Sequence, residues 1–573
     1  MLIIKHVKDP NQQITYTTKI FMKKVIYHLL ILNITIVSCF LAWTLIVGYT
    51  TSIESLLKLS NQQSNHDKVF ALMTKSKFYG AQIIELFLIL GLVFLFLKRE
   101  NFYTTGITVF KYVNNALRRL LSNFFHSSGP IIVFIPLATC IYCAFVIPVS
   151  YDEAYTYLSF TTKTPLTSAL YYPLPNNHIL HSIITNFTHY IPFLSDLVCL
   201  RISNIFITFL MWMICFSFWK KFYSEKFSLI LTGISSMLFM SVYYSYMSRG
   251  YELVSLFFVV SLYCTYQIIQ HSSEKRYWII FSISSILGFY TMPSYLYPFL
   301  TLHACLLLGR SPLIRSQKSS FFSTIAIVAV IYTPIILVNG LKAIVGNVYV
   351  QPIPRLLLIE KLPSFFSETL QTIFGIPWLF IAPLMAISLL YVVYKKDSFH
   401  IKTISIFIAA PFLLLGVHSV IPFPRTFYYY SVIVAFLCLY PAYSFIQRFS
   451  TKTILLCVIV AQVLLFVNFT NVITEYENYS ISSHHIITQI IGAKNYFINS
   501  EQFDIFLRFE LQTSGYKSVV PNVVFPPVKM SSDTMTSYDY VVIDKKYDMT
   551  QNRKPTYTNR LSNIYSSKYL SVQ

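Results

Sequence analysis

Residues 130–154 read PIIVFIPLATCIYCAFVIPV followed by SYDEA, and this stretch decides the fold class of the chain. The apolar part, 130–149, carries no charged side chain and is about as long as the 20 residues that a helix needs to cross a bilayer. Because backbone polar groups find no partners in lipid, such a run predicts a transmembrane helix. The acidic pair Asp152 and Glu153 follows at once, so we expect two carboxylates at the mouth of this helix.

Similar apolar runs recur along nearly the whole chain. Of its 573 residues, 55% are hydrophobic and only 12% are charged, whereas soluble domains are roughly a quarter charged. Two runs, 277–291 and 294–309, are short and have basic residues on both flanks, and we interpret them as a hairpin of two short spans. We predict an all-α polytopic membrane protein with about thirteen spans, at 25–49, 80–97, 130–149, 202–219, 227–247, 253–270, 277–291, 294–309, 321–338, 377–394, 403–420, 427–445 and 453–469.

The formal net charge is +21, which on a soluble protein would point to nucleic acid. Here the basic residues form short clusters between alternate spans, as the positive-inside rule requires of cytoplasmic loops. We therefore predict that the amino terminus is cytoplasmic and that the chain binds no nucleic acid. The clusters are Lys19/Lys23/Lys24, Lys98/Arg99/Arg118/Arg119, Lys220/Lys221/Lys226, Lys275/Arg276, Arg310/Arg315/Lys318, Lys395/Lys396/Lys402 and Arg448/Lys452.

The segment 471–573 differs from the rest of the chain. It mixes charged residues with short β-like runs at 519–525 and 540–543, separated by prolines and polar residues. An odd number of spans after a cytoplasmic start places this segment outside. We predict a small α/β domain there, preceded by an extension with two spans at 1–129 and a catalytic transmembrane module at 130–470.

The outer loop 150–201 contains the residues with the strongest chemical signal. Burying a carboxylate at a membrane surface costs free energy unless the carboxylate has a partner or a function. The plainer interpretation of Asp152 and Glu153 is a solvated helix cap. The functional interpretation is a carboxylate that takes a proton from an acceptor hydroxyl or binds a divalent metal ion. The spacing alone leaves both interpretations open.

The sequence PNNHILH at 175–181 places two histidines three residues apart in the same loop. His178 and His181 would share one helical face, with Asn177 beside them. A lone histidine is usually structural, but this polar group also suits hydrogen bonding to a phosphate or a sugar, or metal ligation. No complete set of metal ligands is visible in the sequence.

Two arginines lie in short joints between spans, Arg249 in SRGYE and Arg425 in PFPR. An unpaired charge is unfavourable at this depth. An ion pair of Arg249 with Glu252, and snorkelling of Arg425 to the lipid headgroups, would explain both without a function. Guanidinium groups also bind phosphates through two parallel hydrogen bonds, so binding of a donor phosphate is the alternative.

These motifs resemble those of the GT-C superfamily of glycosyltransferases, specifically the dolichyl-phosphate-mannose protein mannosyltransferase and aminoarabinose transferase group and its bacterial relatives. The resemblance rests on the acidic pair at 152–153, PNNHILH, FLSDLVCLRISN at 193–204, and Arg249-Gly250-Tyr251. It covers roughly residues 130–469. The chain departs from the pattern in its two extra spans before residue 130 and in having His178 where many relatives are Pro-rich.

The resemblance implies a GT-C fold and a metal-dependent or metal-assisted inverting transferase that takes a hexose or a pentose from a polyprenyl-phosphate donor, with a divalent metal ion as its possible cofactor. It makes Asp152 the base or metal-linked carboxylate, Glu153 its companion and Arg249 the residue for the lipid phosphate. From charge and predicted topology, Arg425 joins Arg249 in that role. The acceptor would be a lipid, a glycan or a protein, and the site would face the outside of a bacterial inner membrane.

A transporter or flippase of a lipid-linked saccharide is the main alternative, because it too would combine many spans with a few charged residues. Such proteins often consist of two similar halves with interrupted spans, and we find no such halves in this sequence. The long outer loop and the outer domain favour an enzyme. A polysaccharide polymerase or ligase would share the chemistry and differ in its acceptor.

Overall fold

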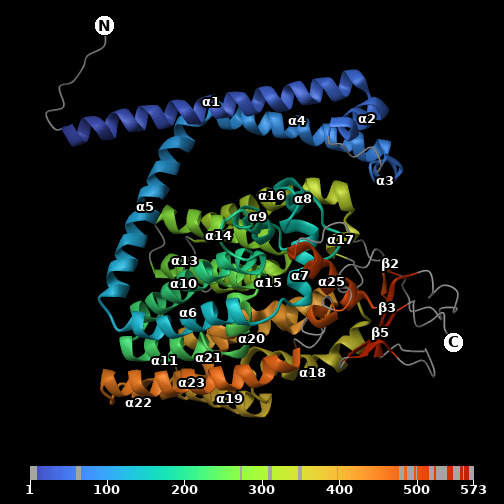
Figure 1. Ribbon diagram of the computed structural model, residues 1–573. Helices are drawn as coiled ribbons and strands as arrows, with labels where there is room; N and C mark the ends of the chain where they lie inside the picture. Colours follow the sequence, from blue (N-terminus) through green and yellow to red (C-terminus); the bar gives the residue numbers. More distant parts are fainter. Residues whose placement is uncertain are drawn as a thin grey trace, which may run out of the picture. The chain divides into compact units, whose positions relative to one another are not determined.

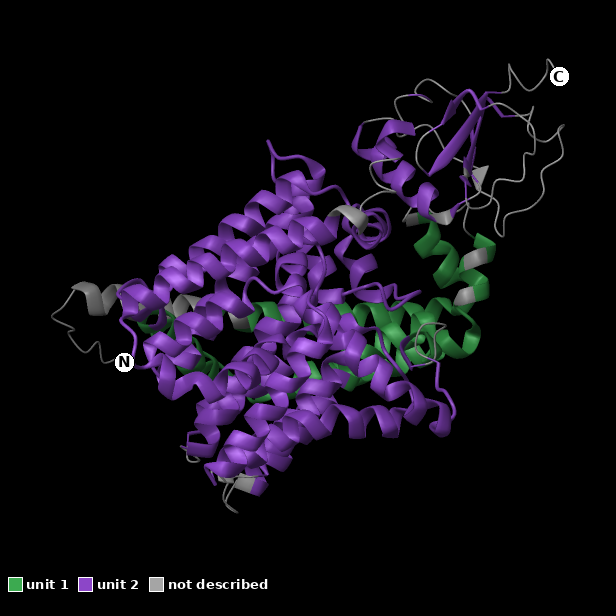
Figure 2. Ribbon diagram, turned by 90° about the horizontal axis from the view of Figure 1, so that it is seen from below, with its two compact units in different colours: residues 1–119, 329–343 green, residues 120–328, 344–573 purple. Residues whose placement is uncertain are grey.

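The computed structural model describes residues 10–59, 66–270, 274–307, 313–345, 351–396, 398–476, 483–486, 489, 496–498, 500–514, 522–523, 538–545, 555–558 and 561–566. The chain divides into two compact units, which Figure 2 colours separately. Unit 1 comprises Met1–Arg119 and Ala329–Ala343, and unit 2 comprises Leu120–Val328 and Ile344–Gln573.

Unit 1 contains two long apolar helices, α1 (Pro10–Val47) and α4 (Lys75–Leu97), which lie side by side (Figure 1). Gln82 of α4 donates a hydrogen bond to Thr44 of α1 (3.2 Å). Polar contacts of this kind help to hold apolar helices together in lipid, where no hydrophobic force does so. The other helices of this unit are α2 (Tyr49–Leu59), α3 (His66–Leu72) and most of α5 (Arg99–Phe125).

Unit 2 is built on a bundle of helices. Its longer members are α6 (Gly129–Val146), α10 (Asp196–Phe222), α11 (Glu225–Ser235), α12 (Phe239–Tyr246), α13 (Tyr251–Gln270), α14 (Lys275–Thr291), α15 (Leu296–Leu306), α18 (Arg355–Phe374), α19 (Trp378–Tyr394), α20 (Ser398–His418), α21 (Ser431–Leu439) and α23 (Thr451–Tyr476). Helix α16 (Leu313–Asn339) is divided between the units, with residues 329–339 in unit 1. Helices α6, α10 and α13 run side by side, as Figure 1 shows. Trp212 of α10 and Phe258 of α13 are fully buried among them.

Nine helices of the described residues are long and apolar enough to cross a membrane, or up to eleven if each of two bent pairs counts as one span. The chain is therefore a multi-pass membrane protein, with fewer spans than the thirteen expected. The predicted hairpin at 277–309 accounts for part of the difference. Pro293 separates α14, with 17 residues, from α15, with 11 residues, and each is shorter than the roughly 20 residues that a bilayer requires.

One predicted span, 227–247, is a bent helix pair, and another, 377–394, is the second helix of such a pair. Helices α11 and α12 meet at 70°, and α18 and α19 meet at 99°. The second bend follows from two residues, since Gly375 has a positive φ of 67° and Pro377 comes just before α19. A left-handed residue ends a helix, and proline suits the start of the next one.

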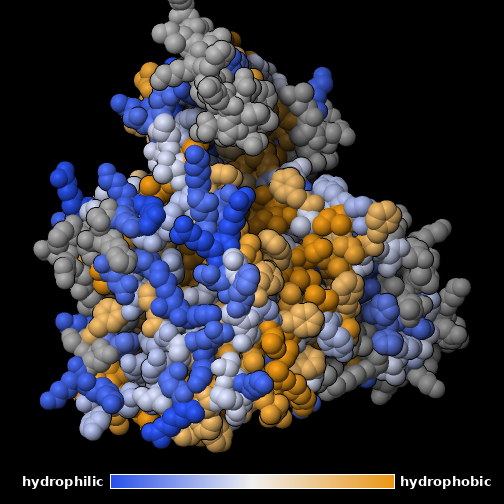
Figure 3. Space-filling model, turned by 90° about the vertical axis from the view of Figure 1, so that its left-hand side faces the viewer, coloured by the Kyte–Doolittle hydropathy of each residue, from blue (hydrophilic) through white to orange (hydrophobic). Residues whose placement is uncertain are grey.

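The two ends of the bundle in unit 2 differ in chemistry. Arg201, near the start of α10, contacts Glu153, whereas Lys220 and Lys221 lie in the last turn of α10. At about 1.5 Å per residue these positions are roughly 28 Å apart, close to the thickness of a bilayer core. Figure 3 faces the end where α10 finishes, and hydrophilic side chains gather on the left of this face beside a hydrophobic area. Which end faces the outside stays a prediction.

A small α/β domain occupies the carboxyl-terminal part of the chain, as predicted. Five short strands form one sheet in the order β2-β1-β3-β5-β4. Strand β1 pairs in parallel with β2 and β3, and β3 pairs antiparallel with β5. The strands are β1 (Tyr496–Ile498), β2 (Asn522–Val523), β3 (Tyr540–Asp544), β4 (Tyr557–Thr558) and β5 (Ser562–Ser566).

Helix α25 (Glu501–Thr513) covers this sheet. Its residues Phe503, Leu507 and Leu511 follow a spacing of four and join the sheet residues Val542 and Ile564 in one buried core. The predicted run at 540–543 corresponds to β3. Of the predicted run at 519–525, only the two residues of β2 are described.

Candidate active site

The acidic pair lies on a short helix, α7 (Tyr151–Thr156), directly after α6. The Ser150 hydroxyl accepts a hydrogen bond from the Glu153 amide, and the Glu153 carboxylate accepts one from the Ser150 amide. This capping box satisfies two amides that the start of a helix leaves free. A π-helical turn, η2 (Tyr157–Thr161), continues α7. Because neighbouring residues of a helix point in different directions, Asp152 and Glu153 have separate surroundings.

Glu153 is fully buried, and partners surround its carboxylate. Its oxygens accept hydrogen bonds from Arg201 Nε (2.8 Å), Arg201 Nη2 (2.7 Å) and the Ser248 amide (2.8 Å). Burial by itself would raise the pKa of this carboxyl, but the Arg201 guanidinium and the hydrogen bonds hold the pKa below its usual value. Glu153 is therefore an ionised partner of Arg201 in the protein interior.

Arg201 is a residue of the site that the sequence motifs did not single out. Its guanidinium also donates to the carbonyls of Ala144 (3.1 Å), Ile147 (2.7 Å) and Pro148 (3.0 Å), at and just beyond the end of α6. A signal was present, because an arginine near the start of an apolar span requires a buried partner. The pair with Glu153 joins the end of α6, the start of α7 and the start of α10.

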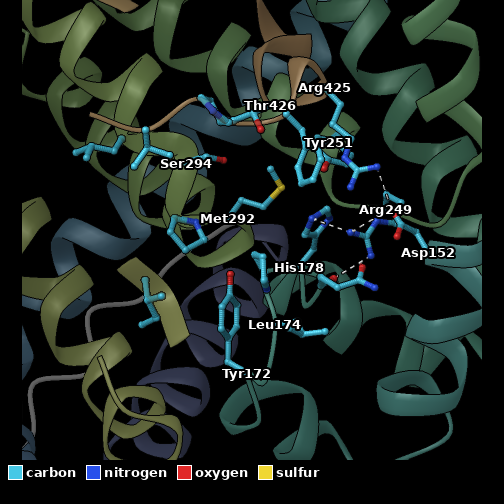
Figure 4. A pocket seen from close by; sticks show the side chains of 18 of the residues that line it. Asp152, Tyr172, Leu174, His178, Arg249, Tyr251, Met292, Ser294, Arg425 and Thr426 are labelled. Carbon is cyan, nitrogen blue, oxygen red and sulfur yellow. Dashed lines mark hydrogen bonds and ion pairs between the residues drawn. The ribbon is translucent and has the colours of Figure 1, made fainter. Parts of the chain in front are cut away.

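Asp152, one residue earlier, meets two cations. Its Oδ2 is 3.4 Å from Arg425 Nη1 and 3.9 Å from Arg249 Nη2. The side chains of Asp152 and Arg425 are 22% and 35% exposed, whereas that of Arg249 is buried at 2%. Figure 4 shows the three charged groups together on one side of a cavity. Arg425 belongs to a 3-10 turn, η4 (Pro424–Tyr430), which leads into α21.

Arg249 is held by neutral partners as well as by Asp152. Its Nη1 donates to the Thr156 hydroxyl (3.0 Å) and to the Asn176 carbonyl (2.8 Å). Glu252, the alternative partner, instead accepts a hydrogen bond from the Tyr428 hydroxyl (2.6 Å). Arg249 thus faces the cavity and not the interior of the bundle.

His178 lies against Arg249, and its neutral ring cannot accept hydrogen bonds from both of its neighbouring donors, the Gly250 amide and the Arg249 guanidinium. The Gly250 amide donates to His178 Nδ1 (2.7 Å), so a neutral ring carries its proton on Nε2. That nitrogen is 3.2 Å from Arg249 Nη2, which is also a donor. Burial, with the charge of Arg249, lowers the pKa of His178 well below its usual value, so the ring is neutral. Two neighbouring donors of this kind suit an anionic ligand.

Gly250 is required for this arrangement. A Cβ atom added to it would lie 2.7 Å from Cγ2 of Thr291 and 2.9 Å from Cβ of His178. These separations are shorter than ordinary van der Waals contact. The absent side chain therefore lets the imidazole approach the backbone just after Arg249.

His181 and Asn177 lie behind the cavity and do not line it. In helix α9 (Ile179–Thr188), the His181 Nε2 is 2.8 Å from Asn204 Oδ1, and the Asn204 amide donates to the Arg249 carbonyl (3.1 Å). Asn177 donates to the carbonyls of Ser168 and Tyr171 and so fastens its own loop. The structure thus brings together Asp152, His178, Arg249 and Arg425, and leaves Glu153, His181 and Asn177 outside the cavity.

The cavity has a volume of about 410 Å³ and a mixed lining. Figure 4 places Met292 and Ser294 across from the charged groups. Several tyrosines and a set of apolar residues were not selected from the sequence, because tyrosine and aliphatic residues are common throughout a membrane protein. The tyrosines are Tyr151, Tyr155, Tyr172, Tyr251 and Tyr297, and the apolar residues include Leu174, Met292, Pro293, Leu296, Ile344, Val345 and Val420.

The residues around Asp152 do not fit a divalent metal ion. Within the described part of the chain, no group of three His, Cys, Asp or Glu side chains is arranged to hold a metal. Asp152 already has two guanidiniums within 4.0 Å, and these would repel a second cation at the same oxygen. The acceptor nitrogen of His178 is occupied by the Gly250 amide.

No protein-family model matches the chain, and no curated protein matches it. Several solved structures are similar to it at low sequence identity. The oligosaccharyltransferase of Archaeoglobus fulgidus in its apo form is 11% identical, with a TM-score of 0.46 over 74% of this chain and 70% of that one. ArnT from Cupriavidus metallidurans is 11% identical in the apo state (TM-score 0.47; 76% and 97%) and bound to undecaprenyl phosphate (0.41; 77% and 98%). Similarity at this level assigns neither a family nor a substrate.

Proposed function

We propose that this protein is a membrane glycosyltransferase that transfers a sugar from a polyprenyl-phosphate donor to an acceptor hydroxyl on the outer face of the membrane. The observation that carries the proposal is the position of Asp152 between Arg249 and Arg425, at the wall of a cavity that is otherwise largely apolar or aromatic. A sugar phosphodiester on a long lipid needs cations for its phosphate and an apolar or aromatic surface beside them.

The arginines would bind the phosphate of the donor. Both carry an Nε atom that lacks a hydrogen-bond partner within the described residues, and His178 adds a donor beside Arg249. A buried guanidinium with a free donor suits a phosphate oxygen, because each charge-assisted hydrogen bond is stronger than a neutral one. The phosphate would replace Asp152 as the anionic partner of the two cations.

Asp152 would act as the general base. When the donor phosphate engages the arginines, the carboxylate becomes available to accept the proton of the acceptor hydroxyl. The acceptor oxygen then forms a bond to the anomeric carbon while the bond from that carbon to the phosphate oxygen breaks. Arg249 and Arg425 stabilise the negative charge that develops on the departing phosphate. Attack from the side opposite the phosphate would invert the anomeric configuration. No step in this scheme uses a metal ion.

The lipid part of the donor would remain in the bilayer. Arg201, next to the site, is roughly 28 Å along α10 from Lys220, so the site lies near one membrane surface. Residues such as Met292 and Leu296 line the cavity without polar groups that would need partners. The polyprenyl chain can therefore stay in lipid while its phosphate reaches the arginines.

The orientation can be tested separately from the chemistry. We expect the carboxyl-terminal domain and Asp152 outside and Lys396 inside, in a bacterial inner membrane. In a variant with the exposed Cys39 and Cys457 replaced by serine, Tyr540→Cys should react with an impermeant thiol reagent on intact cells, and Lys396→Cys only after permeabilisation. The reverse pattern would contradict the orientation.

The function itself is tested with purified protein in lipid, radiolabelled polyprenyl-phosphate sugars and lipid, glycan and peptide acceptors. We expect label in an acceptor, and a loss of about 10² to 10⁴ in rate for Asp152→Asn, because an amide cannot take the proton. Asp196→Asn is the matched control, since Asp196 is partly exposed and pairs with His189 instead of an arginine. Label that crosses the membrane on its lipid without transfer would favour a flippase and overturn the proposal.

A further inference from the structure

Helix α25 of the carboxyl-terminal domain has apolar residues on two faces. Phe503 and Leu507 face the sheet of their own domain. Phe506 and Phe509 belong to a separate buried cluster, formed with residues that surround the acidic pair. A helix that only covers a sheet needs one apolar stripe, so the second stripe indicates a second contact. The buried members of that cluster are Val149, Ala154, Tyr157, Leu200, Phe506 and Phe509.

Two ring contacts join α25 to the acidic helix α7 and to the π-helical turn η2 that continues it. The rings of Tyr151 and Phe506 have centroids 6.2 Å apart at an angle of 78°, and those of Tyr157 and Phe509 are 5.1 Å apart at 73°. Both are edge-to-face pairs, the arrangement that aromatic rings prefer. Figure 1 shows α25 next to α7. The contacts therefore lie on either side of Asp152 in the sequence.

Each face of α7 has a different neighbour. Tyr151 and Ala154, three residues apart, turn to α25. Glu153 turns to Arg201. Asp152 and Tyr155, also three residues apart, turn to the cavity. Tyr151 has a part in two of these surroundings, since it both packs against Phe506 and lines the cavity.

A helix of six residues has little stability of its own, because nucleating a helix is unfavourable and isolated short helices are marginal in water. The ion pair between Glu153 and Arg201 fixes one face of α7. It does not by itself fix the rotation of the helix about that point. The packing of Phe506 and Phe509 supplies the second support, on the side away from the arginine.

We propose that α25 is a positioning element of the active site, through which the carboxyl-terminal domain holds α7 so that Asp152 points at the donor phosphate and the acceptor. This inference rests on the proposed function of Asp152. It gives the carboxyl-terminal domain a role in turnover that is separate from its own folding. Displacements of about 1 Å in a catalytic group lower rates by as much as about a hundredfold.

The test compares two substitutions of equal size on the two faces of α25, in the full chain in lipid. Phe506→Leu removes the ring that contacts Tyr151, and Phe503→Leu removes a ring from the core of the domain. We expect Phe506→Leu to lower kcat by about tenfold or more with a donor KM within about twofold of wild type. Phe503→Leu should lower the melting temperature and leave kcat within about twofold.

A second measurement does not depend on activity. Hydrogen–deuterium exchange of the peptide 150–158 should become faster in Phe506→Leu and stay unchanged in Phe503→Leu. Unchanged kcat and unchanged exchange in Phe506→Leu would overturn the inference, as would equal losses in both variants. If wild-type protein transfers no sugar from any donor, the proposed function fails, and the exchange of this peptide still decides whether α25 holds α7.

Discussion

Two neighbouring residues of one short helix have opposite surroundings. Glu153 is fully buried, and Arg201 and the Ser248 amide bind its oxygens at 2.7–2.8 Å. Asp152 is partly exposed and lies 3.4 Å and 3.9 Å from two arginines whose other donors are not all used. We call the pair of Glu153 and Arg201 the saturated region. Asp152 with Arg249 and Arg425 forms the open region, in which donors of both arginines lack partners within the described residues. Two carboxylates that are adjacent in sequence can thus differ in role, since Glu153 pairs with Arg201 in the interior and Asp152 faces the cavity.

The arginines differ in the same way. Arg201 donates to Glu153 and to four carbonyls at and just beyond the end of α6, so we expect it to have no direct contact with a substrate. Arg249 faces a carboxylate at 3.9 Å and a histidine ring with its own proton. Substitutions in the saturated region should therefore act on stability, and those in the open region on turnover and donor binding.

The largest effect is expected in the saturated region. Glu153→Gln leaves the Arg201 charge without its counter-ion and should lower the free energy of unfolding by about 3–5 kcal/mol. Asp152→Asn, one residue away, should cost less, because the Asp152 carboxylate is partly exposed and lies farther from its arginines, at 3.4 Å and 3.9 Å. Thermal unfolding in detergent, followed by intrinsic fluorescence, measures both. The double variant Glu153→Leu with Arg201→Met should regain much of the loss, and equal instability of all three would refute the distinction.

Acid should affect His181, which supports Arg249 of the open region through Asn204, and Glu153, in the saturated region, in different pH ranges. Burial and the nearby Arg249, against the hydrogen bond to Asn204, lower the pKa of His181 to about 4. Between about pH 6.5 and pH 4 the unfolded chain then binds a proton that the folded chain does not, so stability falls as the pH falls. The pKa of Glu153 is lowered too, and its contribution is lost only below its ordinary value near 4.5.

At pH 5 the loss from His181 should reach about 2 kcal/mol relative to pH 7. The measurement is the melting temperature of wild type and of His181→Gln at pH 7, 6 and 5. The variant cannot titrate in this range, so its melting temperature should decline less steeply. Parallel slopes for the two proteins would show that His181 does not contribute.

Donor binding should respond to the geometry of the open region. Arg249→Lys keeps the charge but loses the fork that binds two oxygens, and we expect the donor KM to rise about tenfold. Arg425→Lys should raise it by only about threefold, because Arg425 is 35% exposed and its charge is partly screened. Labelled-donor titrations give both values. A larger effect of Arg425→Lys would reverse the order of the two arginines.

The smallest effect is expected where the two arginine-bearing segments meet. Glu252 and Tyr428 each follow an arginine of the site by three residues, and the hydrogen bond between them joins the start of α13 to η4. Tyr428→Phe should raise the donor KM by about twofold to threefold, in line with the loss of one hydrogen bond. Tyr430→Phe is the matched control, because the Tyr430 hydroxyl bonds the Phe407 carbonyl instead. Equal shifts in both variants would argue against this coupling.

The sequence was sufficient to select Asp152, Arg249, Arg425 and His178 as neighbours, because each lies in a loop or joint that was predicted on the same side of the membrane. It was not sufficient to separate Asp152 from Glu153. Their roles depend on the rotation of a helix whose start is set by the capping residue Ser150. Hydropathy also could not distinguish His181, which supports Arg249 through Asn204, from His178, which touches Arg249 directly.

The number of spans was overestimated for a related reason. Apolar composition shows where a segment prefers lipid but not whether its helix is continuous. The runs 277–291 and 294–309 were counted as two spans although their helices have only 17 and 11 residues, and a bend of 70° divides the predicted span 227–247 into α11 and α12. The small carboxyl-terminal domain was recognisable from its change in composition, whereas its contact with α7 was not, because Phe506 and Phe503 look alike in sequence.

The contact of Tyr157 with Phe509 joins residues about 350 positions apart in the chain. A ribosome that adds about 5–20 residues per second needs roughly 20 to 70 s to make the intervening chain. During that time α7 is already synthesised but its aromatic neighbours do not yet exist. A nascent chain that lacks α25 therefore holds an incomplete site, and the proposed transfer would begin only after the carboxyl-terminal domain has been made and has docked.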